Sequence, residues 1–384
     1  MQRDVAFLLL VGAHATSACT AYAAGKDATT DGSVMVSHSD DGAGASDSRV
    51  SFVPAADHAP GSVRPIWPDV EDWPRFVGDA RGATYLPADG QAPTAPIGSI
   101  PQVAHTYAYL DGNYAVQNEC QLSFGESTAS AAFGKTAGAV GTPGGKALFS
   151  VNELTRVAAE RVCSAREAIQ LMGSLAESHG FYGADGGAGE VLMVGDVDEA
   201  FVFHILSDPS GTGAIWVAQR VPDDHVAVVA NCMTIREVSA RAILGRAILA
   251  RAILRALLSE PSPRSSQVDL DDAHTFLGSS NMHAIAKEHG LWDGKGKLSF
   301  VDAFSGGEYA NQYYTGRRVW DGYRRFSASQ KFPATYKDLK RDRPYPATAK
   351  VDAKMSVRDW FAAHRSHYEG TPYDTTKGLA AGPF

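Results

Sequence analysis

The chain has 384 residues, of which 44% are hydrophobic and 20% are charged, an ordinary globular composition that suffices for one large domain or two modest ones. Its formal net charge of -8 argues against nucleic acid as the main partner, because binding a polyanion usually requires a basic surface. Four cysteines (Cys19, Cys120, Cys163 and Cys232) are too few and too scattered for a disulfide scaffold, and no CxxC pair suggests zinc. We therefore expect no structural metal and no cofactor.

Residues 1–18 have the pattern of a secretory signal peptide. Arg3 precedes a short apolar stretch at 5–11, and small residues follow it. The stretch is too short to span a membrane, so we expect no stable membrane insertion. A buried N-terminal strand is one alternative. A lipoprotein signal is another, although such signals normally carry an aliphatic residue where this chain has Thr16. We favour a signal peptide and a secreted, lysosome-like or vacuole-like protein.

A cut after residue 18 would make Cys19 the first residue of the mature chain. That residue would then carry both a thiol nucleophile and a free α-amine, whose reference pKa of roughly 8 lets it act as a base near neutral pH. An ordinary buried thiol is the more common role of a lone cysteine. The position of Cys19 directly after the signal favours the catalytic role.

The first part of the mature chain predicts a β-hairpin, with strands at 20–24 and 33–37 around an Asp-Gly turn. A hairpin of this length brings its far end back beside its first residue, so Asp40 or Asp41 is expected near Cys19. A solvated acidic turn is the alternative interpretation of the Asp-Asp-Gly sequence that begins at Asp40.

Loop-like sequence, rich in Gly, Ala, Pro and Asp, follows over residues 42–100. A β-rich segment at 103–124 ends in the sequence GEST at 125–128. Two capping-box patterns, Ser150 with Glu153 and Ser164 with Glu167, then mark the starts of two helices, each with one apolar face for the core.

An antiparallel meander of four strands is predicted over residues 190–229, and it places Asn231 at the end of its last strand. Further helices are predicted at 281–289 and 356–367. His364 and His367 lack a cluster of partner ligands and are interpreted as surface or hydrogen-bonding residues. Strands and helices thus alternate in blocks, which predicts an α+β fold with helices layered on antiparallel sheets.

One segment departs from this pattern. The sequence Arg-Ala-Ile-Leu begins at Arg241, Arg246 and Arg251, and a five-residue period turns by about 140° per repeat on a helix, so no single apolar face forms. A membrane-surface helix is therefore disfavoured. We interpret the block 239–268 as an atypical insertion, such as a retained intron, within a single domain at 19–384.

The sequence CTAYAAGKDATTDGS at residues 19–33 resembles the start of the N-terminal-nucleophile cysteine dipeptidases, the family of lactobacillar dipeptidase A, which is related to secernins, penicillin V acylase and bile-salt hydrolase. Several ordered motifs are more specific than any one alone. The likeness continues in order through residues 125–128, 215–223, 230–231, 367–374 and 378–384.

The resemblance implies a four-layer αββα sandwich and a cysteine-type exopeptidase that hydrolyses dipeptides or short peptides without a metal. Cys19 would be the nucleophile and, through its amine, the general base. Asp41 matches the acidic residue that orients this amine, and Asn231 matches an asparagine of the oxyanion hole. The second oxyanion donor is expected from the backbone near Glu126. Removing one such donor typically lowers the rate on the order of 10²–10³-fold.

Two departures from the family pattern affect this expectation. Many relatives have Arg-Asn where this chain has His38-Ser39, so a cation that would hold the thiolate is absent or replaced by His38. Relatives also continue beyond Phe384, so we expect the sandwich to be incomplete at its C-terminus. The alternative function is an inactive secreted or lipid-anchored protein, the product of a truncated, insertion-bearing gene model.

Overall fold

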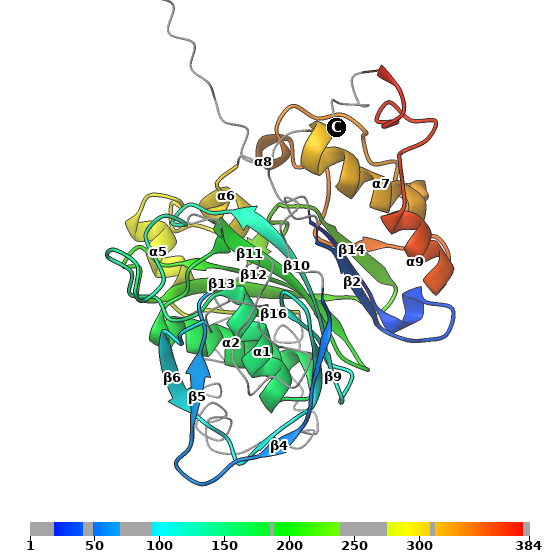
Figure 1. The fold of residues 1–384 in the computed structure, drawn as a ribbon. Coiled ribbons are helices and arrows are strands. Elements are labelled where there is room, and N and C mark those ends of the chain that lie inside the picture. The colour runs from blue at the N-terminus through cyan, green and yellow to red at the C-terminus, as the bar shows by residue number, and fades with distance from the viewer. Residues whose placement is uncertain are drawn as a thin grey trace, which may run out of the picture.

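The computed structural model describes residues 19–40, 49–69, 94–184, 188–238, 275–307 and 312–378 (Figure 1). The segment 1–18, Asp41, the block 239–268 and Phe384 lie outside these ranges, and the expectations for them stay predictions. Within the part that the structure describes, every helix falls short of the length and apolarity that a membrane crossing requires.

Two antiparallel sheets form the centre of the fold. In spatial order, the larger sheet consists of β16 (Phe276–Gly278), β13 (Ala214–Val221), β12 (Ala200–Ser207), β11 (Ala188–Gly195), β10 (Ser123–Ser130), β9 (Ala115–Asn118), β8 (Tyr109–Asp111) and β3 (Ser51–Val53). The smaller sheet consists of β18 (Ala349–Lys350), β14 (His225–Val229), β1 (Thr20–Ala24) and β2 (Met35–Ser39). This arrangement confirms the predicted α+β class.

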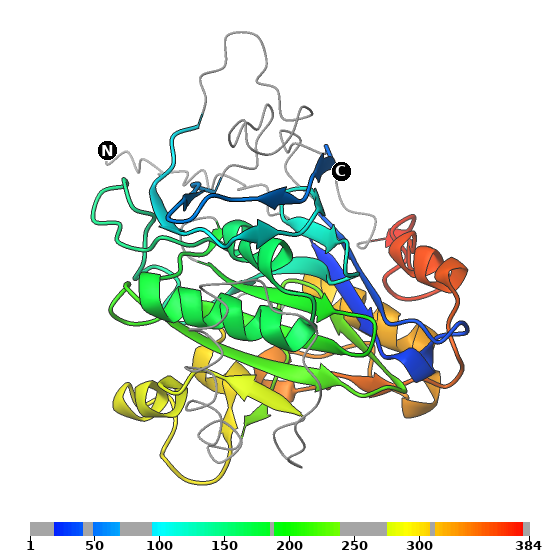
Figure 2. The same ribbon diagram turned by 90° about the horizontal axis from the view of Figure 1, so that it is seen from below.

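Helices cover the outer face of each sheet. The helices α1 (Val151–Arg161) and α2 (Ala165–His179) bury an apolar face against the larger sheet, and α7 (Arg317–Phe326) and α9 (Val357–His364) pack on the smaller one. The inner faces of the two sheets pack on each other. The order is therefore helices, sheet, sheet, helices. Figures 1 and 2 both show the C-terminal helices, in orange and red, beside the N-terminal strands, in blue.

Successive side chains of β1 point to opposite faces of the smaller sheet, so this short strand contributes to two hydrophobic cores. Ala21 and Ala23 face the larger sheet, whereas Tyr22 and Ala24 face the C-terminal helices. On the helix side, a Cβ on Gly322 of α7 would lie 2.8 Å from Val228 Cγ2, so glycine lets this helix approach the sheet closely.

The remaining elements are short and lie outside the two large sheets. They are β4 (Ala56–Asp57), which pairs with β7 (His105–Thr106), β5 (Val63–Ile66), which pairs with β6 (Gly98–Pro101), β15 (Glu237–Val238), which pairs with β17 (Leu298–Ser299), and the helices η1 (Lys26–Ala28), α5 (Met282–Glu288), α6 (Phe300–Phe304), η4 (Gln312–Gly316), η5 (Ala328–Gln330) and α8 (Leu339–Asp342).

The expectation of loop over residues 42–100 is wrong in part, because several short strands interrupt the loops where the structure describes this segment. Strand β3 lies at the edge of the larger sheet, and β5 and β6 form a two-stranded ribbon. Strands of three or four residues are too short for periodicity to reveal them, and Phe52 of β3 is exposed between two buried neighbours.

The predicted meander is correct for three strands and wrong for the fourth. Strands β11, β12 and β13 are consecutive neighbours in the larger sheet, but β14 crosses to the smaller sheet and pairs with β1. Both sheets bury their inner faces, so the apolar pattern of residues 225–229 fits either sheet equally well. The crossing brings the end of β14 beside the start of β1.

The predicted helix starts are confirmed, but their caps differ. Ser164 accepts a hydrogen bond from the backbone N–H of Glu167, as a cap should. Ser150 makes no such bond, and the reciprocal bond of a capping box is also missing because the carboxylate of Glu153 pairs with Arg64 and Arg156. The helix predicted at 356–367 ends earlier, at His364.

Candidate active site

The register of the smaller sheet determines what surrounds Cys19. Strand β1 pairs with β14 as Ala21↔Val229 and with β2 as Thr20↔Ser39. Continuing these antiparallel registers places Cys19 opposite Asn231 on one side and opposite Asp40 on the other. Cys19 is fully buried at this point and forms no disulfide.

Asp40 is the acidic residue that contacts the thiol. Its Oδ1 accepts from Cys19 Sγ at 3.8 Å, and its Oδ2 accepts from Asn113 Nδ2 at 2.5 Å. Opposite residues of an antiparallel pair project to the same face, which explains why Asp40 meets Cys19. Asp41 lies outside the described residues, so its predicted role at the α-amine stays a prediction.

Asn231 is held in a single orientation by four hydrogen bonds. Its Oδ1 accepts from Arg318 Nη2 at 2.9 Å and from Tyr314 Oη at 3.1 Å. Because Arg318 can only donate, the oxygen must face it and the amide nitrogen must face Thr128 O, to which Nδ2 donates at 2.8 Å. The backbone N–H donates to Ser127 Oγ at 2.8 Å. This pattern leaves the second N–H of Nδ2 without a partner among the described residues.

Ser127 connects the nucleophile to Asn231. Its Oγ donates to the backbone carbonyl of Cys19 at 3.2 Å while accepting from Asn231, and its side chain is fully buried. The neighbouring residue, Glu126, has its backbone N–H directed at His38 Nδ1, 3.2 Å away. The donor that we expect near Glu126 is therefore already paired in this state.

Of the two alternatives for the cation of the family pattern, the structure does not favour replacement by His38. Burial lowers the pKa of its imidazole, although the nearby carboxylate of Asp40 opposes this effect. Its Nδ1 accepts a hydrogen bond from Glu126, so the ring is neutral, with its proton on Nε2. The ring lies 5.6 Å from that of Tyr114.

Arg318 is the charged residue that sequence reasoning missed. Its Nη1 donates to Cys19 O at 2.7 Å and to Thr20 Oγ1 at 3.2 Å, and its guanidinium carbon lies 4.3 Å from the centroid of the Tyr314 ring. It is only 8% exposed. The sequence did contain a signal for this residue, since Arg318, Gly322 and Phe326 are spaced four residues apart and lie on one face of a helix. Gly322 and Phe326 pack on the sheet, so Arg318 lies on the buried face of α7.

The other cysteines are structural, as expected, but two of them pair. Cys120 and Cys163 form a disulfide, which the sequence interpretation did not predict. Cys232 is buried, and burial raises the pKa of its thiol, which makes it a poor nucleophile. Within the described ranges, no three His, Cys, Asp or Glu side chains gather into a group that could hold a metal ion.

Comparisons with known proteins agree with the resemblance of the motifs. The model of peptidase family C69 matches residues 95–243 and 262–381. A probable dipeptidase of Latilactobacillus sakei is 23% identical over 93% of this chain and 62% of its own length. A probable dipeptidase of Salmonella dublin is 23% identical over 97% of this chain and 72% of its own length. Dipeptidase A of Lactobacillus helveticus is 21% identical over 55% of this chain and 35% of its own length. The chain thus spans less than two thirds of the L. sakei protein.

Proposed function

Because this chain belongs to peptidase family C69, we propose that its mature form is a cysteine-type dipeptidase with an N-terminal-nucleophile hydrolase fold, in which Cys19 attacks the peptide bond of dipeptides or short peptides. The observation that carries the proposal is the set of side chains that the fold gathers around the buried Cys19. Three segments that are far apart in sequence supply an acidic side chain, an oriented amide and a guanidinium to one cysteine: Asp40, Asn231 and Arg318.

In the proposed reaction, the α-amine of Cys19 takes the proton of the thiol, and the thiolate adds to the substrate carbonyl. The remaining N–H of Asn231 Nδ2 and the N–H of Glu126, once released from His38, would stabilise the oxyanion. The C–N bond then breaks, and the leaving amine takes the proton from the ammonium of Cys19. Water hydrolyses the thioester and restores the thiol. Asp41 is proposed to orient the α-amine throughout.

We further propose that residues 1–18 are a signal peptide and that the protein enters the secretory pathway. The Cys120–Cys163 disulfide supports this proposal, because such bonds persist mainly in oxidising compartments. We retain the proposal that the block 239–268 is an insertion. The interruption of the family match between residues 243 and 262, inside this block, supports it.

The function is tested by replacing Cys19 with Ala or Ser in the mature chain. Both variants are expected to lose dipeptide hydrolysis below detection, because neither has a thiol at residue 19. Their far-UV circular dichroism spectra and melting temperatures should stay close to those of wild type. Cys232→Ala is the matched control, since Cys232 is also a buried cysteine outside the disulfide, and it should retain activity. Hydrolysis by Cys19→Ala at the wild-type rate would remove Cys19 from the mechanism.

N-terminal sequencing and intact mass of the secreted protein distinguish the enzyme from a non-catalytic protein. The dipeptidase requires a chain that begins at Cys19 with a free amine, because that amine is the proposed base. A retained or acylated N-terminus would contradict the mechanism and favour an inactive product, which acylation would anchor to lipid.

A further inference from the structure

A tight turn on the larger sheet reaches into the site of the smaller sheet. Residues 112–114 connect β8 to β9, and the side chain of Asn113 donates to Asp40 Oδ2 at 2.5 Å. The other carboxylate oxygen of Asp40 faces Cys19 Sγ. Asn113 is 8% exposed and donates to the carboxylate that contacts the nucleophile, so this turn contributes to the orientation of Asp40.

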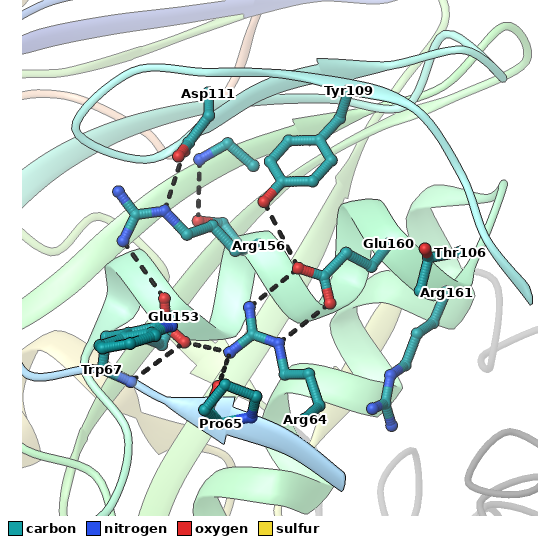
Figure 3. Close-up of polar contacts among 12 residues, drawn as sticks. Arg64, Pro65, Trp67, Thr106, Tyr109, Asp111, Glu153, Arg156, Glu160 and Arg161 are labelled. Carbon is teal, nitrogen blue, oxygen red and sulfur yellow. Dashed lines mark hydrogen bonds and ion pairs between the residues drawn. The ribbon is translucent and has the colours of Figure 1, made fainter. Parts of the chain in front are cut away.

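One buried arginine fixes the backbone of this turn. Arg156 of α1 donates through Nη2 to Gly112 O at 3.3 Å and to Asn113 O at 2.9 Å. Through Nε it also binds Asp111 Oδ1 at 2.8 Å, so it contacts three consecutive residues of the turn and the strand before it. Figure 3 shows the guanidinium between Asp111 and Glu153.

The arginine is itself held by a chain of buried ion pairs. Glu153 accepts from Arg156 Nη1 at 3.3 Å and also binds Arg64, which donates to Glu160 at 3.0 Å through Nε and at 2.9 Å through Nη2 (Figure 3). Glu153 and Asp111 are fully buried. Buried ion pairs contribute little net stability compared with apolar packing of the same volume, so stability alone does not account for this set of five charges.

We propose that Arg156 is a positioning residue for the candidate active site, acting through Asn113 on Asp40 and thereby on the Cys19 thiol. This inference rests on the proposed dipeptidase function. The ion-pair network holds residues 112–114 in a fixed position on α1. Through Asn113, this position on the larger sheet determines where Asp40 lies beside the smaller sheet. Arg156 contacts the turn at Gly112 and Asn113, so the proposed effect on the reaction is exerted through the geometry of Asp40.

The test is a double-mutant cycle of Arg156→Lys and Asn113→Ala in the mature enzyme. Each single variant is expected to lower kcat on the order of 10- to 100-fold with KM within about twofold, because displacement of a catalytic group by about 1 Å has effects of this size. If Arg156 acts through Asn113, the double variant loses no more than Asn113→Ala alone. Independent, multiplicative losses in the double variant would overturn the proposal.

Two matched controls separate positioning from general destabilisation. Arg161→Lys changes another buried arginine of α1, which binds Pro101 O and Gln102 instead of the turn. Asn118→Ala removes a buried asparagine whose side chain, within the described ranges, binds backbone groups around α1 and in its own turn. Both controls are expected to lower the melting temperature and leave kcat of the folded enzyme unchanged. An equal loss of kcat in the controls would overturn the proposal.

A second readout keeps this inference separate from the proposed function. The rate of alkylation of Cys19 by iodoacetamide, followed by peptide mass mapping, reports on the thiol without any substrate. Relative to wild type, the alkylation rate of Cys19 is expected to change by the same factor in Arg156→Lys, Asn113→Ala and the double variant. If wild type hydrolyses no dipeptide, the proposed function fails while this experiment still tests the positioning role. If alkylation is unchanged in Asn113→Ala, the positioning role fails even for an active enzyme.

Discussion

At the scale of single residues, one guanidinium connects the nucleophile to the amide that would bind the oxyanion. Arg318 donates to the carbonyl of Cys19 and to the side-chain oxygen of Asn231. Its planar, multiply donating head can reach both acceptors at once, whereas a lysine ammonium is a compact point charge on a flexible stem. Arg318 therefore fixes the distance between the two groups on which the proposed reaction depends.

Replacing Arg318 with Lys is expected to lower kcat on the order of 10²-fold, because Asn231 loses the charged one of the two donors that orient its amide, and its N–H is then less well aimed at the oxyanion. Steady-state kinetics on a dipeptide measures this loss. Arg325→Lys is the control, since Arg325 lies on the same helix but binds Asp321 and Ser366. Equal kcat values for Arg318→Lys and wild type would show that Asn231 keeps its orientation without the arginine.

The sequence predicted part of this site and missed the rest for physical reasons. Cys19 and Asn231 follow from local motifs, and the structure places them just beyond the ends of the adjacent strands β1 and β14. The contact between Cys19 and Asp40 depends on the hairpin register, which a shift of one residue would change. Arg318 lies 299 residues from Cys19, so no local pattern relates them.

At the scale of elements, α9 is attached to β2, the strand that carries His38 and directly precedes Asp40. Trp360 Nε1 can only donate, and it donates to Ser37 Oγ of β2 at 2.5 Å; the hydroxyl therefore donates to His364 Nε2, 2.7 Å away. The imidazole also packs edge-on against Tyr22. This contact requires a neutral histidine, since a protonated Nε2 could no longer accept from Ser37.

The attachment of α9 is expected to weaken in acid. Burial, together with nearby His38, lowers the pKa of His364 from 6.5 to about 4. A histidine whose pKa is depressed on folding stabilises the fold fully above its unfolded pKa, near 6.5, and this contribution is lost as the pH falls toward 4. The variant His364→Gln can still accept from Ser37 but cannot titrate. Its melting temperature should therefore fall less than that of wild type between about pH 7 and about pH 4.

His367→Gln is the control for this measurement, because His367 is an exposed histidine of the same C-terminal segment. Its stability is expected to follow the wild-type curve at every pH. Parallel curves for His364→Gln and wild type would mean that protonation of His364 does not open the contact between α9 and β2.

At the scale of the whole molecule, the sequence predicted the kinds of element and not their assignment to layers. The capping patterns located the starts of α1 and α2, and the alternation of residues 190–229 located the strands. Membership of β14 in the smaller sheet depends on long-range pairing with β1, which apolar patterning alone cannot determine because both sheets are buried on their inner faces.

The disulfide holds two of these layers together. Cys120 follows β9 in the larger sheet and Cys163 lies between α1 and α2, so the bond closes a loop across a sequence separation of 43 residues. A cross-link of this length typically stabilises the folded state by about 2–4 kcal/mol, largely by restricting the unfolded chain. It also anchors the end of α1, the helix that carries Arg156 and Glu153.

Replacing Cys120 and Cys163 together with Ser is therefore expected to lower the free energy of unfolding by about 2–4 kcal/mol, measured by urea denaturation. Reductant should destabilise wild type by a similar amount and leave the double variant unchanged, because the variant has no bond to reduce. Since Cys19 lies in the other sheet, kcat of the folded variant should change far less than its stability. If reductant destabilised both proteins equally, its effect would not come from this bond, and the link between the helix layer and the larger sheet would rest on apolar packing alone.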